Sequence, residues 1–222
     1  MLKSVEKLNS IFTSILNLVY VNFLWVLFTL LGLGVFGIGP STYALVSICR
    51  QWIRGNSMPV FKTYWKYYKE NFKESVIISW IYFFVGFVLV VDLLTVTNWY
   101  LRAALLLISF IYLLSFVYIF PIMAHYNWNG ILLKIKMSFL FGISCLQYSM
   151  VFLLVAGVIY WAAISFFPGV LTFFGVSFLL YLITWTANQV FTRMEIENSK
   201  ETNINEKVKE NCDEKTNGIK VS

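Results

Sequence analysis

Long apolar runs constrain this chain more than any other feature of its sequence. A helix that crosses about 30 Å of hydrocarbon needs about 20 apolar residues, because unpaired backbone groups cannot be left in lipid. The segments that meet this requirement are residues 16–38, 76–96, 103–123, 144–166 and 170–191. We therefore predict an all-α fold, a polytopic transmembrane helical bundle of about five spans.

The composition supports a single membrane domain. Hydrophobic residues make up 59% of the 222 positions and charged residues 13%, whereas a soluble domain has roughly 45–50% and about 25%. The apolar segments fall within residues 1–192, which we take as one transmembrane domain. Residues 193–222 are polar and lack aromatic side chains, so we expect a disordered tail.

The lysines and arginines predict how the chain is oriented, since short basic loops stay in the cytosol. Apart from Arg102 in a short turn, the basic residues between spans are Arg50, Arg54, Lys62, Lys66, Lys69, Lys73, Lys134 and Lys136. Their stretches and the C-terminal tail are therefore predicted to be cytosolic, which places the N-terminus outside if the first segment crosses once. Lys3 and Lys7 argue against that placement. If residues 41–53 re-entered the membrane, the N-terminus could lie in the cytosol together with Lys3 and Lys7, but a segment of about 13 residues is too short to span the bilayer.

Residues 57–75 form an amphipathic segment with helical periodicity. Its apolar face carries Val60, Phe61, Tyr64, Trp65, Tyr68 and Phe72, and its other face carries Lys62, Lys66, Lys69 and Lys73. We expect a cytosolic helix in the membrane interface, with its rings among acyl chains and its lysines among anionic headgroups. The same helix is a candidate docking site for a partner protein, but not for nucleic acid, because its aromatic residues are needed for the membrane.

The candidate residues for this membrane or partner surface come from the segment and from the residues just before it. They are Trp52, Arg54, Lys62, Trp65, Lys66, Lys69, Asn71, Phe72 and Lys73. A second candidate group is the intramembrane pair Asp92 and Arg102, which lie near the ends of a tight helical hairpin. Because charges inside a membrane are expensive, we predict that these two form an interfacial ion pair rather than a substrate or proton site.

The residues that carry enzymatic chemistry are scarce. His125 is the only histidine, and one histidine cannot supply the three or four ligands of a zinc site. The chain has three cysteines, Cys49, Cys145 and Cys212, and their spacing shows no paired motif. The sequence therefore predicts neither a disulfide nor a metal site formed by thiolates. Nucleophile-elbow, phosphate-loop and metalloprotease motifs are missing. We predict a non-enzymatic protein without a cofactor, a catalytic residue or a metal.

An ordered set of residues resembles the YesL-like family of bacterial multi-pass membrane proteins, which carry a domain of unknown function. The set comprises Asn22, Trp25, Gly39, Pro40, Trp52, Arg54, Gly55, Asn71, Phe72, Lys73, Phe120, Pro121 and Ala124. We assign structural roles to five of these: Asn22, Trp25, Gly39, Pro40 and Pro121, with the prolines ending spans. The resemblance implies a place in the bacterial cytoplasmic membrane and an accessory role beside carbohydrate uptake systems.

The leading hypothesis is therefore a non-enzymatic partner of carbohydrate transporter subunits that binds through residues 40–75. The alternative is a small-solute transporter or channel, which would need a polar cavity near Asn22, Asn188 and Gln189. A membrane enzyme is the third hypothesis, and it would need polar side chains converging on His125 or Asp92. Sequence leaves open whether the chain forms a homo-oligomer.

Overall fold

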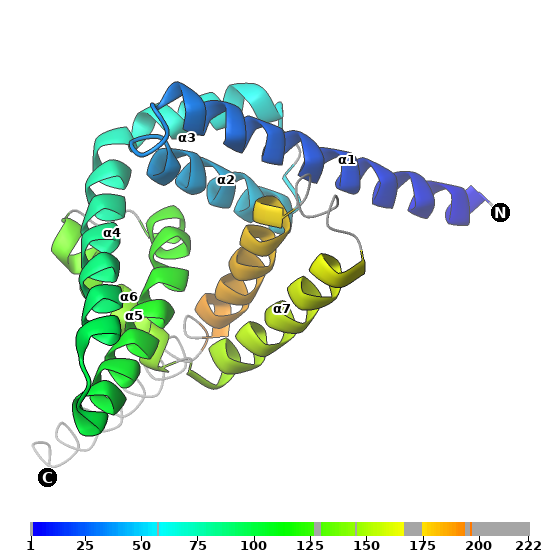
Figure 1. Cartoon of the computed structure of the whole chain (residues 1–222). Coiled ribbons are helices and arrows are strands. Elements are labelled where there is room, and N and C mark those ends of the chain that lie inside the picture. Colours follow the sequence, from blue (N-terminus) through cyan, green and yellow to red (C-terminus); the bar gives the residue numbers. More distant parts are fainter. Residues whose placement is uncertain are drawn as a thin grey trace, which may run out of the picture. The chain divides into compact units, whose positions relative to one another are not determined.

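The computed structural model describes residues 2–56, 58–126, 130–144, 146–166, 175–193 and 196, and these residues are mostly helical (Figure 1). The helices are α1 (Leu2–Leu31), α2 (Ile38–Ile53), α3 (Val60–Glu70), α4 (Phe72–Thr95), α5 (Trp99–His125), α6 (Ile131–Ser144) and α7 (Leu146–Phe166), followed by a helix over residues 175–193. The predicted all-α bundle is confirmed.

The chain divides into two compact units, Met1–Thr186 and Ala187–Ser222. The bundle described below belongs to the first unit. In the second unit the described residues, 187–193 and 196, are helical. The rest of the predicted disordered tail lies outside the described residues.

Three helices of the described chain are long and apolar enough to cross a membrane: Phe12–Leu31 within α1, Phe72–Thr95 and Trp99–His125. They correspond to the first three predicted spans. The 21-residue helix α7 covers most of the fourth predicted segment. The fifth predicted segment is described from residue 175 onward, and residues 167–174 lie outside the described residues.

α1 and α2 form an antiparallel hairpin, which corrects the predicted end of the first span. α1 ends at Leu31, not at Gly39 and Pro40, because the glycine-rich turn has Leu33 and Gly34 at positive φ values of 58° and 72°. Pro40 instead lies in the first turn of α2, where the missing backbone N–H has no helical partner to lose. The turn is tight, since a Cβ on Gly37 would lie 2.4 Å from the Thr29 carbonyl oxygen.

α2 is the most buried helix of the described chain. Every residue from Gly39 to Cys49 is buried, and α2 contacts α1, α3, α4 and α5. The sequence did not decide whether residues 41–53 lie in the membrane interface or re-enter the membrane. In the structure this segment belongs to an interior helix. A helix buried on all sides needs small or apolar residues around its whole circumference. Here these include Ala44, Leu45 and Val46.

α3 packs part of its aromatic face against α1 and α2. Tyr64 and Tyr68 are buried, and their ring centroids lie 5.0 Å and 5.1 Å from that of Phe28. The expectation that all the rings of this face enter the bilayer is wrong for these two tyrosines. Their hydroxyls reach backbone carbonyls inside the bundle, and such a bond is favourable for a tyrosine with an apolar body and one polar end.

α4, α5 and α6 complete the part of the bundle that concerns function. α5 packs against both α4 and α6. Pro121 lies inside α5, which continues to His125, so the prediction that this proline ends the span is wrong. A proline removes one helical hydrogen bond, and this one sits about a turn before the helix end among buried neighbours. In Figure 1, α1 and α2 run side by side and across the direction of α4.

Candidate functional site

The exposed face of α3 is the first candidate site. We define the α3 surface as Phe61, Lys62, Trp65, Lys66 and Lys69, together with Lys73 in the first turn of α4, all of which are exposed. The ammonium of Lys69 lies 4.3 Å from the ring centroid of Trp65, within the range of a cation–π contact. The surface therefore combines positive charge with exposed aromatic area, the composition that sequence predicted for it.

The opposite face of α3 is fixed to the bundle by hydrogen bonds. The Tyr64 hydroxyl donates to the Ser41 carbonyl at 2.9 Å, and the Tyr68 hydroxyl donates to the Phe28 carbonyl at 3.3 Å. The Gln51 side chain donates to the Tyr67 hydroxyl at 3.1 Å. Because α1 and α2 both hold this helix, the α3 surface is preorganised rather than loosely attached.

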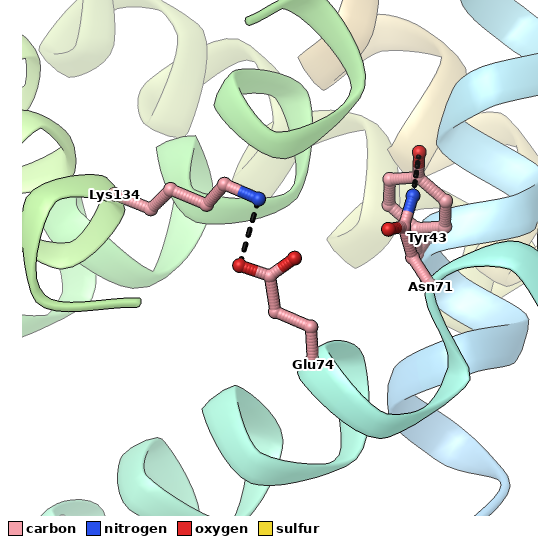
Figure 2. A network of polar contacts seen from close by, with 4 residues as sticks. All are labelled: Tyr43, Asn71, Glu74 and Lys134. Atoms are coloured by element: carbon pink, nitrogen blue, oxygen red, sulfur yellow. Dashed lines mark hydrogen bonds and ion pairs between the residues drawn. The ribbon is translucent and has the colours of Figure 1, made fainter. Parts of the chain in front are cut away.

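Three predicted surface residues turn inward. Trp52 and Phe72 are partly buried and pack against the core. Asn71 joins α3 to α4, and its side-chain amide donates to the Tyr43 hydroxyl at 2.7 Å (Figure 2). Arg54 is exposed at the end of α2. The predicted set thus separates into an exposed basic group and an inner group that positions it.

The candidate pair Asp92 and Arg102 is not joined in the structure. Both residues are described, and the ion pair found in the described chain involves other residues. Asp92 lies about one turn before the end of α4, and Arg102 is an exposed residue in the first turn of α5. Both can therefore reach water or headgroups without each other, and burial does not force them to pair.

A buried ion pair that the sequence analysis missed joins α4 to α6. The Lys134 ammonium lies 2.7 Å from a Glu74 carboxylate oxygen, and Lys134 is only 5% exposed (Figure 2). Glu74 is in the first turn of α4, where the helix dipole favours a negative charge. Its partner is 60 residues away in sequence, so only the fold brings the pair together.

Buried hydroxyl groups continue the contact between α4, α5 and α6. The Tyr82 hydroxyl and Ser115 Oγ are 2.5 Å apart, and Ser115 Oγ is 3.1 Å from Ser138 Oγ. The Tyr112 hydroxyl donates to the Tyr82 carbonyl at 2.7 Å. Hydrogen bonds of this kind between membrane helices contribute roughly 0.6 kcal/mol each. They align the three helices.

Arg50 caps the end of α5, a role that sequence did not reveal. Its guanidinium donates to the carbonyls of Ala124 and His125, the latter at 3.4 Å. The last carbonyls of a helix have no partners within the helix, and a cation there also favours the helix dipole. This contact joins α2 to the His125 end of α5 and explains why the last turn of the most buried helix carries an arginine.

A large apolar cavity is the second candidate site. It has a volume of about 920 Å³ and opens to the outside. Its lining residues come from α1, α2, α4, α5, α7 and the helix that begins at residue 175. They are Trp25, Ile38, Thr42, Ser79, Phe83, Gly86, Phe87, Val90, Tyr112, Phe116, Val117, Phe120, Pro121, Tyr160, Gly175, Val176, Leu179, Leu180 and Ile183. No lining residue is charged, so the cavity suits an apolar ligand.

Two of the predicted structural residues, Trp25 and Pro121, line this cavity. The Trp25 indole N–H donates to Thr42 Oγ1 at 3.2 Å and so joins α1 to α2 at the cavity wall. The Asn22 side-chain oxygen accepts from the Ser177 backbone N–H at 3.3 Å. Asn22 thus links α1 to the helix that begins at residue 175. Asn188 and Gln189 belong to the second unit.

Metal and thiol chemistry find little support in the described residues. Within them, no group of three histidine, cysteine or acidic side chains is close enough to hold a metal ion. Cys49 is a free cysteine, buried on α2. Cysteines buried in this way are usually structural.

Comparison with known proteins places the chain in a family. Residues 18–93 match the model of a family described as "Protein of unknown function, DUF624". The chain is 35% identical to the uncharacterized protein YteU of Bacillus subtilis (strain 168) over 173 residues, which cover 75% of this chain and 77% of YteU. The chain belongs to this family.

Two further relatives from the same organism extend the match. The uncharacterized protein YesL is 29% identical over 199 residues, covering 87% of this chain and 94% of YesL. The uncharacterized protein YesV is 30% identical over 121 residues, covering 51% of this chain and 58% of YesV. No solved structure matches the chain. The resemblance to YesL-like proteins is confirmed, and the matched family region contains α2, α3 and most of α4.

Proposed function

We propose that this membrane protein is a non-enzymatic accessory protein that binds another membrane protein through the α3 surface. The observation that carries the proposal is a helix held rigidly on one face while its other face exposes lysines and aromatic rings. Aromatic residues dominate the binding energy of many interfaces, and a preorganised surface loses little conformational entropy on binding. Lysines around such a patch steer a partner of opposite charge.

We further propose that the partner is a subunit of a carbohydrate transporter and that the protein is a multi-pass protein of the bacterial cytoplasmic membrane with a cytosolic C-terminus. The choice of partner rests on the family resemblance, and the orientation rests on the positions of the basic residues. In this orientation the α3 surface would face the cytosol beside the membrane, where it could contact cytosolic subunits of a transporter.

The alternative of a small-solute transporter loses support from the cavity. A solute pathway was expected to show a polar cavity near Asn22, Asn188 and Gln189. The cavity described above is apolar instead, and the Asn22 side chain already accepts a hydrogen bond. A sugar in this cavity would leave its hydroxyls unpaired, which is unfavourable. An enzyme would need polar side chains converging on His125 or Asp92, and these two residues cannot act together because they lie at opposite ends of the antiparallel α4–α5 pair.

The proposal is tested by isolating the tagged protein from its native membrane in a mild detergent and identifying the bound proteins. We expect the wild type to retain transporter subunits and the Lys66→Glu, Lys69→Glu variant to lose them, because the charge of the surface is reversed. The matched control is Lys66→Arg with Lys69→Arg, which keeps the charge and should keep the partner.

Equal recovery of the partner with the glutamate variant would contradict the assignment of the α3 surface. If the wild type retains a different membrane protein, and the glutamate variant loses it, the surface is correct and the choice of a carbohydrate transporter is wrong.

A further inference from the structure

We propose that the apolar cavity is a binding site for one acyl chain of a membrane phospholipid. Neither the family nor the α3 surface assigns any role to this cavity, so the inference is independent of the proposed function. It rests on the chemistry of the lining, on the size of the cavity, and on the position of its walls within candidate membrane spans.

The polar atoms of the lining are already occupied. Thr42 Oγ1 accepts from Trp25 and donates to the Ile38 carbonyl at 2.7 Å. The hydroxyls of Tyr112 and Tyr160 donate to the carbonyls of Tyr82 and Gly175. Each of these side chains therefore uses its hydrogen-bonding capacity within the protein and presents its apolar part to the cavity.

The remaining polar atom, Ser79 Oγ, is the hydroxyl among the lining residues that has no hydrogen-bond partner. A buried water typically makes two to four hydrogen bonds to polar groups. One hydroxyl cannot hold the water that about 920 Å³ would admit. The cavity is therefore suited neither to a column of water nor to a hydrophilic solute.

The size and the lining match a flexible hydrocarbon ligand. Pockets for small molecules measure roughly 300–1,000 Å³ and are mostly apolar, and this one lies near the upper limit. Protein interiors are close-packed, because side chains that border a void lose their dispersion contacts. A flexible chain of methylene groups restores these contacts without requiring a hydrogen bond.

The position of the walls selects lipid as the source of that chain. Phe83, Phe87 and Val90 line the cavity and are exposed, and they lie between the middle and the C-terminal end of the candidate span Phe72–Thr95. In a bilayer these residues face hydrocarbon, where acyl chains are the abundant apolar molecules. An acyl chain can therefore enter sideways past α4 while its headgroup stays at the interface.

A pair of neighbouring valines on α4 provides a matched test. Val90 and Val91 are both exposed, but only Val90 lines the cavity. Val90→Trp places an indole at the cavity, and Val91→Trp places the same group on the outer face of the same helix. Val117→Phe, on the α5 wall, is a second way to fill the cavity from a partly buried position.

The measurement is native mass spectrometry of the full chain after reconstitution into vesicles of phosphatidylglycerol and phosphatidylethanolamine and extraction into detergent. We expect the wild type and Val91→Trp to carry one phospholipid, and Val90→Trp and Val117→Phe to lose the lipid-bound peak. Circular dichroism on each sample establishes that the variants are folded.

Three outcomes would overturn the proposal. The wild type could emerge free of lipid, or the folded Val90→Trp and Val91→Trp variants could retain equal amounts, which would mean that the lipid lies on the outer surface. Protein from native membranes could instead carry a different apolar molecule, lost on Val90→Trp, which would exclude phospholipid as the occupant.

Discussion

At the residue scale, the Glu74–Lys134 pair links two helices that are distant in sequence. Lys134 is buried and Glu74 keeps about a quarter of its side chain exposed. A buried pair contributes little net stability compared with apolar residues, but removing one partner leaves an uncompensated charge. The pair therefore fixes how α4 and α6 meet, and its loss should be felt across the bundle.

We predict that Lys134→Met lowers the stability of the protein by about 3 kcal/mol, the lower end of the range for breaking a buried pair, because Glu74 remains partly solvated. For a chain of this length that corresponds to a fall of roughly 10 °C in the unfolding temperature. Thermal unfolding in detergent, followed by circular dichroism, measures the shift.

Lys136→Met is the matched control, because Lys136 is an exposed lysine on the same helix. The double change Lys134→Met with Glu74→Met should recover much of the loss, since no charge is then left buried without a partner. Equal midpoints for the two single variants would show that the ion pair does not hold α4 to α6.

At the element scale, the sequence predicted helices well where the signal was local. Twenty-residue apolar runs produced α4 and α5 nearly at their observed bounds, and the helical periodicity of residues 57–75 produced α3. The same reasoning failed for α2, because 13 residues that contain Arg50 and are followed by Arg54 look like an interfacial segment. Its burial depends on contacts with four other helices, and Arg50 finds its partners at the end of α5.

The candidate sites also divide into features that a local sequence pattern predicts and features that only the fold brings together. The exposed lysines of the α3 surface follow from a repeat of three and four residues, which is visible in the sequence. The cavity is assembled from side chains of six helices, and the Glu74–Lys134 pair from two, so no local pattern marks them. Asn71 and Phe72 were assigned to the surface because polarity and periodicity do not reveal the contact of Asn71 with Tyr43.

The packing of α2 against α4 yields a prediction at Gly39. A Cβ at this position would lie 2.3 Å from Ser79 Oγ and 2.5 Å from the Ser75 carbonyl oxygen. The serine hydroxyl can rotate away, but the backbone of α4 cannot, so Gly39→Ala should force the two helices apart. We expect a loss of about 1–3 kcal/mol, the usual effect of overpacking, seen as a lower unfolding temperature in detergent.

Gly157→Ala is the control for this change. Gly157 lies within α7, and no heavy atom is found within 4 Å of the position its Cβ would take. Alanine there should leave stability unchanged or raise it slightly, because alanine favours helix over glycine by about 1 kcal/mol. A Gly39→Ala variant as stable as Gly157→Ala would mean that α2 and α4 do not approach as closely as described.

At the scale of the whole molecule, the α1–α2 hairpin changes the expected membrane topology. The residues paired by the Trp25–Thr42 hydrogen bond are nearly equidistant from the glycine turn, so α2 returns alongside α1. The N-terminus and the end of α2 therefore lie toward the same side. Because Arg50 and Arg54 are expected in the cytosol, so is the N-terminus, and Lys3 and Lys7 then obey the same rule as the other basic residues.

We predict that a cysteine placed at Ser4 is labelled by a membrane-impermeant maleimide only after the cells are opened, whereas one at Thr97, in the exposed α4–α5 turn, is labelled on intact cells. The background replaces the native cysteines with serine, and Cys49 is buried in any case. Labelling of both positions on intact cells would restore a first segment that crosses once with its N-terminus outside. Labelling of the Ser4 position alone on intact cells would mean that the whole bundle is inverted, with the α4–α5 turn in the cytosol and the α3 surface facing away from any cytosolic transporter subunit.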